Sequence, residues 1–205
     1  MKLFFNLTVL ACLAISCNSI SSAPTREFKT IVSDSLKGRP YNEIDLSRRR
    51  AREFNLPEIH KGVDSFELRI WVTSGMISPE ELVTLRYSDG QWVAARYRYY
   101  DRENTLDSLK MQRINLSDSI GKVVSYLSDP AVLTLPTQAA IPGFVDNVAD
   151  GQDCTLEIST KTFYKVLSYH CPEHFKEPTN KKFMEIVAFL NAYFHFYALI
   201  CLPVE

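Results

Sequence analysis

The chain has 205 residues, in which 23 Lys and Arg nearly balance 24 Asp and Glu, and 46% of the residues are hydrophobic. The presence of only 7 Gly and 10 Pro excludes collagen-like and low-complexity sequences. The near-neutral charge excludes a disordered polyelectrolyte and provides no global field that would attract nucleic acid. The length predicts a single domain that buries a core of its own.

The first residues have the pattern of an export signal. Lys2 gives a short basic start, and residues 3–15 are mostly apolar before the run ends at Cys17. This run has the length of a signal-peptide hydrophobic region and is too short to span a bilayer as a mature helix. We therefore predict that residues 1–16 are a signal peptide that is removed.

The end of this run, Leu13-Ala14-Ile15-Ser16-Cys17, resembles the relaxed lipobox of Bacteroidetes-type lipoproteins. The resemblance implies that the Cys17 thiol receives a diacylglyceryl group and that Cys17 becomes the first mature residue. It also implies that further acylation, of the palmitate kind, anchors an outer-membrane lipoprotein that faces the periplasm. Two alternatives stay open. Cleavage after Ala23 would give a secreted protein, and an N-terminal core helix would give a protein with no signal peptide and no lipid.

The rest of the chain divides into a tether and one domain. Residues 17–25 are rich in Ser and predict a flexible tether. Residues 26–60 predict a helical segment, whose arginines between 48 and 52 form either a solvated helix face or a basic patch for acidic lipid or nucleic acid. The acidic residues beside them favour the solvated face. Residues 61–205 complete a single α+β domain that spans 26–205.

The middle of the chain predicts strands. Apolar and polar residues alternate between Phe66 and Thr73, which is the period of a strand. Ser78-Pro79-Glu80-Glu81 has the pattern of a capping box that opens one helical turn. Asp89-Gly90 then separates two β-prone runs, 82–87 and 92–100, and predicts a hairpin with a type I′ turn. This register pairs Tyr87 with Trp92, Leu85 with Ala94 and Val83 with Arg96.

The second half repeats this mixture of helix and hairpin. Apolar residues at i, i+3, i+4 and i+7 predict an amphipathic helix from Ile120 to Leu127. Residues 154–158 and 163–169 predict a second hairpin, and a broad apolar face from about 180 to 198 predicts a C-terminal helix. The expected fold is an antiparallel sheet built from hairpins, with packed helices that include the C-terminal one.

The five cysteines fall into two groups. Cys12 would leave with the signal peptide and Cys17 would carry lipid, which leaves Cys154, Cys171 and Cys201. A hairpin centred near residue 162 brings Cys154 and Cys171 within one or two residues of being opposite each other, and an exported protein permits disulfides. We expect a Cys154–Cys171 disulfide bond. Three free buried thiols and a pairing with Cys201 remain alternatives.

The segment from His170 to His174 contains the candidate metal ligands His170, Cys171 and His174. A structural zinc site needs four N or S ligands, and no other ligand is placed by the sequence. We therefore expect a proline-bearing corner after a strand, without a metal or other cofactor. The alternative is an envelope hydrolase that uses His170 or His174 near Glu173, although no catalytic motif accompanies them.

The mature region resembles the small envelope lipoproteins of Bacteroidetes in three stretches, Phe66 to Trp71, Asp89 to Trp92 and Tyr169 to Phe175. The resemblance implies no activity and no site residues. The sequence therefore predicts a lipid-anchored envelope protein that acts as a binding or assembly module, with an envelope protein as partner and no nucleic acid. A hydrolase and an inhibitor or immunity-type protein are the alternatives.

Overall fold

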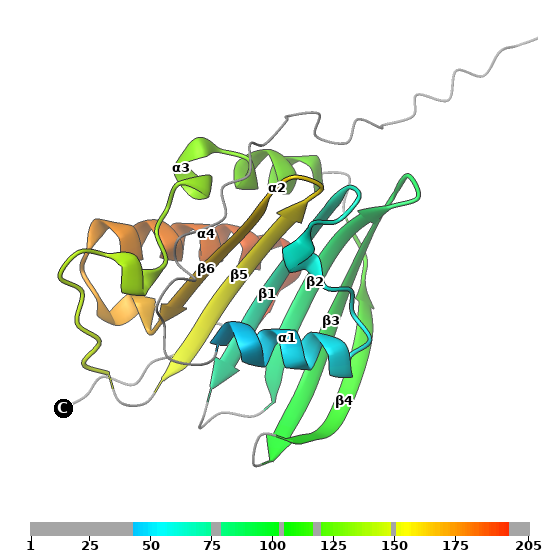
Figure 1. The fold of residues 1–205 in the computed structure, drawn as a ribbon, viewed down its shortest axis with the longest axis horizontal. Helices are drawn as coiled ribbons and strands as arrows, with labels where there is room; N and C mark the ends of the chain where they lie inside the picture. Colours follow the sequence, from blue (N-terminus) through cyan, green and yellow to red (C-terminus); the bar gives the residue numbers. More distant parts are fainter. Residues whose placement is uncertain (1–42, 75–78, 103–104, 117–119, 149–150, 197–205) are drawn as a thin grey trace, which may run out of the picture.

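The computed structural model describes residues 43–74, 79–102, 105–116, 120–148 and 151–196. Six strands form one antiparallel sheet in the order β4-β3-β2-β1-β5-β6 (Figure 1). The strands are β1 (Phe66–Ser74), β2 (Glu80–Ser88), β3 (Gln91–Arg102), β4 (Thr105–Ile114), β5 (Gln152–Thr160) and β6 (Tyr164–His170). The α-helices are α1 (Glu43–Glu53), α2 (Ile120–Leu127), α3 (Pro130–Leu133) and α4 (Pro178–Phe194), and the 3₁₀ turns are η2 (Ile59–Lys61), η3 (Gln138–Ala140) and η4 (Pro172–His174). The predicted α+β fold, with its hairpins and its C-terminal helix, is confirmed.

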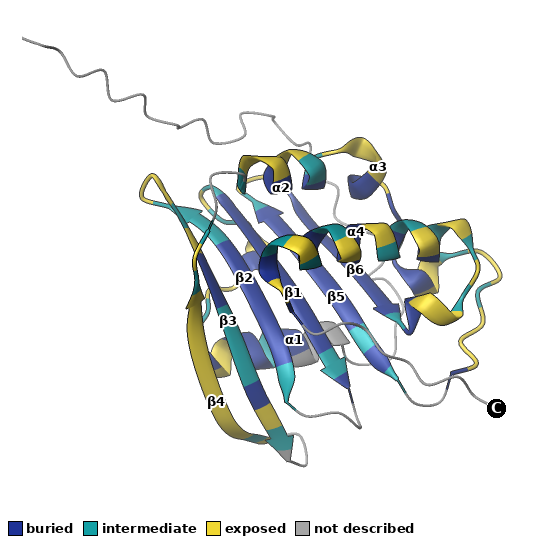
Figure 2. Cartoon of the chain, turned by 180° about the vertical axis from the view of Figure 1, so that it is seen from behind, coloured by how far each residue is buried: buried dark blue, intermediate teal, exposed yellow. Residues whose placement is uncertain are grey.

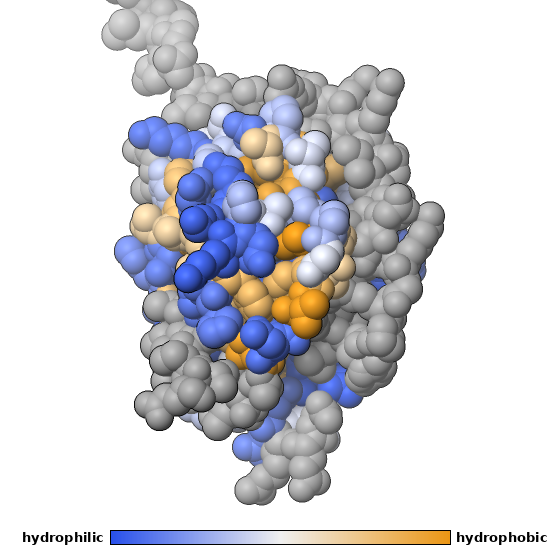
Figure 3. Space-filling model, turned by 90° about the vertical axis from the view of Figure 1, so that its left-hand side faces the viewer, coloured by the Kyte–Doolittle hydropathy of each residue, from blue (hydrophilic) through white to orange (hydrophobic). Residues whose placement is uncertain are grey.

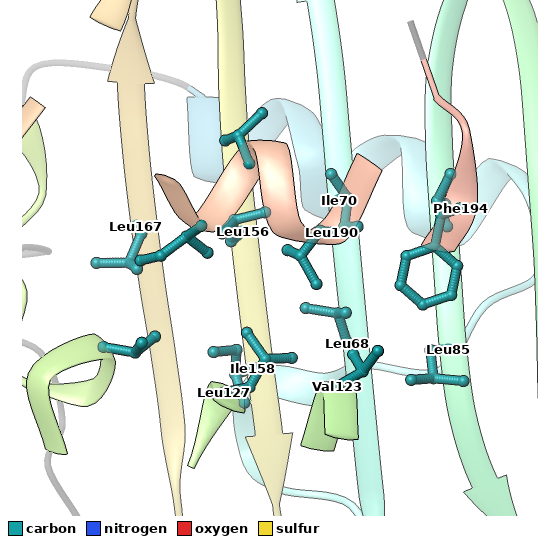
Figure 4. Packing of buried hydrophobic residues seen from close by; sticks show 14 of the residues in the cluster. Leu68, Ile70, Leu85, Val123, Leu127, Leu156, Ile158, Leu167, Leu190 and Phe194 are labelled. Atoms are coloured by element: carbon teal, nitrogen blue, oxygen red, sulfur yellow. The ribbon is translucent and has the colours of Figure 1, made fainter. Parts of the chain in front are cut away.

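The two faces of the sheet are covered by different elements. Helices α2, α3 and α4 lie on one face, which we call the helix side, and α1 lies on the other, which we call the α1 side (Figures 1 and 2). The main core fills the helix side, where Leu68 and Ile70 of β1 meet Leu190 of α4 (Figure 4). These side chains alternate with polar ones because successive residues of a strand point to opposite faces. The predicted period of two in β1 therefore marks the core.

The first hairpin has the predicted register. Tyr87 pairs with Trp92, and the pairing continues to Val83 and Arg96. Asp89 and Gly90 have φ angles of 52° and 77°, which is the left-handed pair that a type I′ turn requires. The Tyr87 and Trp92 rings lie 4.9 Å apart, so the cross-strand aromatic contact also forms.

Two local predictions were wrong because tertiary contacts decided the conformation. Glu80 and Glu81 begin β2 instead of a helical turn, and the Glu81 side chain is buried against arginines of β3. Arg50 does not belong to a solvated helix face. It is fully buried under α1, where it pairs with Glu53 and Asp101 and lies 6.0 Å from the centre of the Tyr99 ring.

Candidate binding site at strand β4 and the end of helix α4

Strand β4 is an exposed edge of the sheet. Within the described residues it pairs only with β3, and all its side chains are exposed apart from two that are half-buried. Figure 2 shows it as an almost continuous exposed ribbon at the side of the molecule. Its pairing with β3 is regular from Ser108 to Ile114, after a bulge next to Tyr100. A row of backbone N–H and C=O groups on such a strand is a template for another strand.

The two faces of β4 differ in chemistry. On the α1 side, Leu109 and Met111 are 40% and 55% exposed, and Arg113, which is also exposed, follows them on the same face. On the helix side, Lys110 lies directly opposite Arg98 of β3, and Gln112 lies opposite Arg96. The α1 side of this edge is therefore apolar at Leu109 and Met111 and basic at Arg113, and the helix side is basic at Lys110.

The basic face contains a like-charge pair that a sheet does not favour. Lys110 and Arg98 are cross-strand neighbours, and like charges in that position destabilise a sheet. Glu81 of β2 offsets part of this charge, with its carboxylate 2.8 Å from Arg96 Nε and 3.5 Å from Arg98 Nε. Lys110 forms no ion pair with any residue that the structure describes. The face thus retains positive charge at its outermost residue.

A hollow of about 570 Å³ lies where β4 meets the end of α4. We call it the α4-end hollow; Gln112, Asn115, Tyr193 and His195 supply polar walls, and Ile114 and Leu116 supply apolar ones. Arg96 holds the helix over the sheet, because its Nη2 donates hydrogen bonds to the Phe194 and His195 carbonyls. The volume is that of a site for a small ligand or a few side chains of a partner.

The α1 side holds charges too, but they have structural partners. The buried Glu67 carboxylate accepts from Arg69 Nε at 2.8 Å and from Arg86 Nε at 3.1 Å. The buried Glu157 carboxylate accepts from Trp71 Nε1 and from the Tyr164 hydroxyl, both at 2.6 Å. The hollow beside this network, under α1, measures only about 10 Å³, which leaves room for no more than a water molecule.

The opposite end of the sheet carries a different surface. Figure 3 faces the β6 side of the molecule, where apolar surface lies between hydrophilic areas. Phe144 and Phe175 pack edge to face with ring centres 4.7 Å apart, and Val145, the residue after Phe144, is 74% exposed. These contacts close a loop against the start of α4 and bring no polar group of defined geometry to the surface.

The residues predicted to form a disulfide bond do not pair. Cys154 is a free, fully buried thiol, whereas Cys171 is bonded to a cysteine outside the described residues. The register explains the error, because Cys154 lies opposite Tyr169, while the Cys171 amide donates to the Gln152 carbonyl two residues away. Diagonal neighbours of this kind are too far apart for an S–S bond. Burial raises the pKa of the Cys154 thiol and makes it unreactive.

The candidate metal ligands are not brought together. His170 ends β6 with its Nδ1 3.0 Å from Asp153 Oδ1, the Cys171 sulfur is in its disulfide, and His174 is exposed on η4 against Phe175. In the described part of the chain, no three His, Cys, Asp or Glu side chains converge as metal ligands would. Neither of the hollows described above is lined by His170 or His174. The predicted lipid site, Cys17, lies outside the described residues.

Strand β4, the edge of the candidate binding site, was not predicted from the sequence. The alternation of Leu109 and Met111 with Lys110 and Gln112 has the period of a strand and could have revealed it.

Comparisons with protein families, with curated proteins and with solved structures find no match for the chain. None of the helices in the described ranges is long and apolar enough to cross a membrane.

Proposed function

We propose that the protein is a lipid-anchored binding module of the cell envelope, which docks a partner through strand β4 and the α4-end hollow. The observation that carries the binding role is the coincidence, at one place, of three features: a strand edge that no described strand covers, a lysine without an ion pair among the described residues, and a hollow of about 570 Å³. These three features suit the binding of a partner, because the edge offers backbone hydrogen bonds, the lysine offers charge and the hollow offers volume.

The anchor rests on the lipobox-like residues that end at Cys17. The Ser-rich stretch of residues 17–25 would then join the lipid to the domain as a short flexible linker. A module held in this way meets its partner at the membrane surface, where tethering raises the effective concentration of both. An inhibitor or immunity-type role is one form of the same proposal, with an enzyme as the partner.

The anchor is tested by changing one residue. Cys17→Ala should abolish incorporation of labelled palmitate and move the protein from the membrane fraction to the supernatant. The wild-type protein, fractionated in parallel, should stay with the membrane. A variant that partitions as the wild type does, with neither protein labelled, would contradict the anchor and leave the binding site to be tested separately.

The binding site is tested by filling the hollow. Ala192 is exposed on α4 and lines the α4-end hollow, so Ala192→Trp should occupy it. Ala188 is exposed one turn earlier and lies outside the hollow, so Ala188→Trp is the matched control. The wild type and Ala188→Trp should retain one stoichiometric partner from native envelopes, and Ala192→Trp should lose it. Equal capture by all three proteins would contradict a site in the hollow.

A further inference from the structure

We infer that β4 pairs with an extended segment of another protein in which acidic and apolar residues alternate. This inference rests on the proposed binding function and adds the chemistry of the partner. It follows from three properties of β4: its exposed backbone edge, the exposed apolar pair Leu109 and Met111 on one face, and the charge of Lys110 between them on the other.

The backbone gives the mode of binding. From Ser108 to Ile114 the strand is regular and exposed, and on its outer side no strand of the described residues pairs with it. An extended segment can therefore continue the sheet, with main-chain hydrogen bonds to β4 supplying affinity. The other edge of the sheet, at β6, is occupied at Ser168 and His170 by side-chain hydrogen bonds from Thr137 and Gln138. Among the described residues, β4 is thus the edge with room for a new strand along its length.

The side chains give the specificity. Residues directly opposite on neighbouring strands have Cβ atoms about 4.5–5.5 Å apart. Side chains of the added strand that point to the helix side therefore meet Lys110, with Arg98 behind it, and carboxylates suit that position. Side chains that point to the α1 side meet Leu109 and Met111, which are apolar and exposed, and beyond them Arg113, which suits a further carboxylate. The pattern required of the partner is acidic and apolar residues in alternation.

The same charges argue against two other occupants. A second copy of β4, paired antiparallel about Lys110, would place two ammonium groups face to face, and a lysine in an edge strand is a known barrier to such pairing. The stretch of this chain between Cys17 and α1 has four basic residues, Arg26, Lys29, Lys37 and Arg39, against Glu27 and Asp34. An acidic segment of a different protein fits the edge better than either.

The α4-end hollow extends this site. Gln112 and Ile114, near the end of β4, form part of its wall, and Asn115 and Leu116 continue the wall beyond the strand. A partner that runs along β4 would reach the hollow at that end and could bury one apolar side chain against Ile114 and Leu116. The added strand would therefore pair along β4, and the side chain in the hollow would fix where along β4 the partner ends.

The probe is an acetylated, fluorescein-labelled peptide of eight residues in which Glu and Val alternate. We expect saturable binding to the full-length protein, measured by fluorescence anisotropy. Lys110→Glu should weaken binding about tenfold, because an attraction becomes a repulsion. Lys161→Glu, an identical charge change on the exposed turn between β5 and β6, should leave it unchanged. A peptide with Lys in place of Glu should prefer the Lys110→Glu variant.

The mode of binding is tested with the same peptide methylated at every backbone nitrogen, which removes its N–H donors. This peptide should not bind. Equal binding of the methylated peptide, or equal weakening by Lys110→Glu and Lys161→Glu, would overturn the inference. A dimer of the protein alone in sedimentation, dissociated by Leu109→Lys, would assign the edge to a second copy instead. Circular dichroism and the melting temperature should confirm that each variant is folded.

The two proposals fail in different ways. If the native partner is captured by the wild type and lost from Ala192→Trp, the binding function stands even when the peptide does not bind. If Lys110→Glu loses the peptide but still captures the native partner, the partner uses the hollow alone. Peptide binding without any native partner would support the edge chemistry and leave the proposed function contradicted.

Discussion

The two edges of the sheet differ in how their backbone groups are satisfied. At β6, Thr137 Oγ1 donates to the Ser168 carbonyl at 2.7 Å and accepts from the Ser168 amide at 3.0 Å. Gln138 makes the same two bonds to His170, which lies two residues after Ser168 in β6. Its Nε2 donates to the His170 carbonyl at 2.9 Å, and its Oε1 accepts from the His170 amide at 2.8 Å. At β4, no residue of the described ranges plays this part.

The difference shows that a strand edge can be closed without another strand. Two consecutive side chains, Thr137 and Gln138, supply the donors and acceptors that a neighbouring backbone would supply. The lysines of the two edge strands differ in the same way, because Lys165 of β6 is only 5% exposed and Lys110 of β4 is exposed. The edge at β6 is therefore buried, and the edge at β4 is exposed.

The largest effect should come from reopening the closed edge. Gln138→Glu preserves the shape of the side chain but removes the donor to the His170 carbonyl and to Asn180 Oδ1. It also brings a negative charge to a buried position. We expect the free energy of unfolding in urea to fall by about 3 kcal/mol.

Gln112→Glu is the matched control for this change, because Gln112 is an exposed glutamine on the open edge. Its effect should stay within about 0.5 kcal/mol. The His170 amide keeps its acceptor in Gln138→Glu, so its hydrogen exchange should quicken only through the loss of global stability, and it should stay slow in Gln112→Glu. Equal stability of the two variants would show that the closure at β6 contributes nothing.

A smaller effect should come from the two edge lysines. Burial lowers the pKa of Lys165, because the charged ammonium is desolvated. Lys165→Met removes this cost and keeps the apolar stem, so the free energy of unfolding at neutral pH should rise by on the order of 1 kcal/mol. Lys110→Met should leave it unchanged, because Lys110 is solvated. A loss of stability in Lys165→Met would mean that the ammonium has a favourable role.

The pH dependence gives a second readout of Lys165. Its pKa in the folded protein lies below its ordinary value of 10.5, so between the two values the unfolded chain binds more protons. The free energy of unfolding of the wild type should therefore rise with pH in that window. The advantage of Lys165→Met over the wild type is complete below the folded pKa and should shrink as the pH approaches 10.5.

The sequence predicted the fold where local chemistry determines geometry. Asp89-Gly90 fixes the first hairpin, because a type I′ turn admits few other residues, and the register followed to the residue. The turn between β5 and β6 has no such pair. Its centre lies half a residue earlier than expected, which moves the partner of Cys154 from His170 to Tyr169 and leaves Cys171 two residues away from the opposite position.

The open edge was harder to foresee, since its meaning depends on what lies beside it. The alternation in β4 is visible in the sequence, but the juxtaposition of Lys110 with Arg98 exists only once the register is known. The closure of β6 likewise requires Thr137 and Gln138 to reach a strand about 30 residues further along the chain. Arg50 was misread for the same reason, because its partner Asp101 is distant in sequence.

The smallest perturbation concerns the thiols next to the closed edge. In the folded protein, Cys154 should resist iodoacetamide, because it is fully buried and its pKa is raised by burial. After unfolding without a reductant, Cys154 should be alkylated and Cys171 should not, and peptide mapping should find Cys171 bonded to Cys12, Cys17 or Cys201. If Cys12 is removed and Cys17 is acylated, Cys201 is the one that remains. A Cys17-linked peptide would therefore contradict the lipid anchor as well.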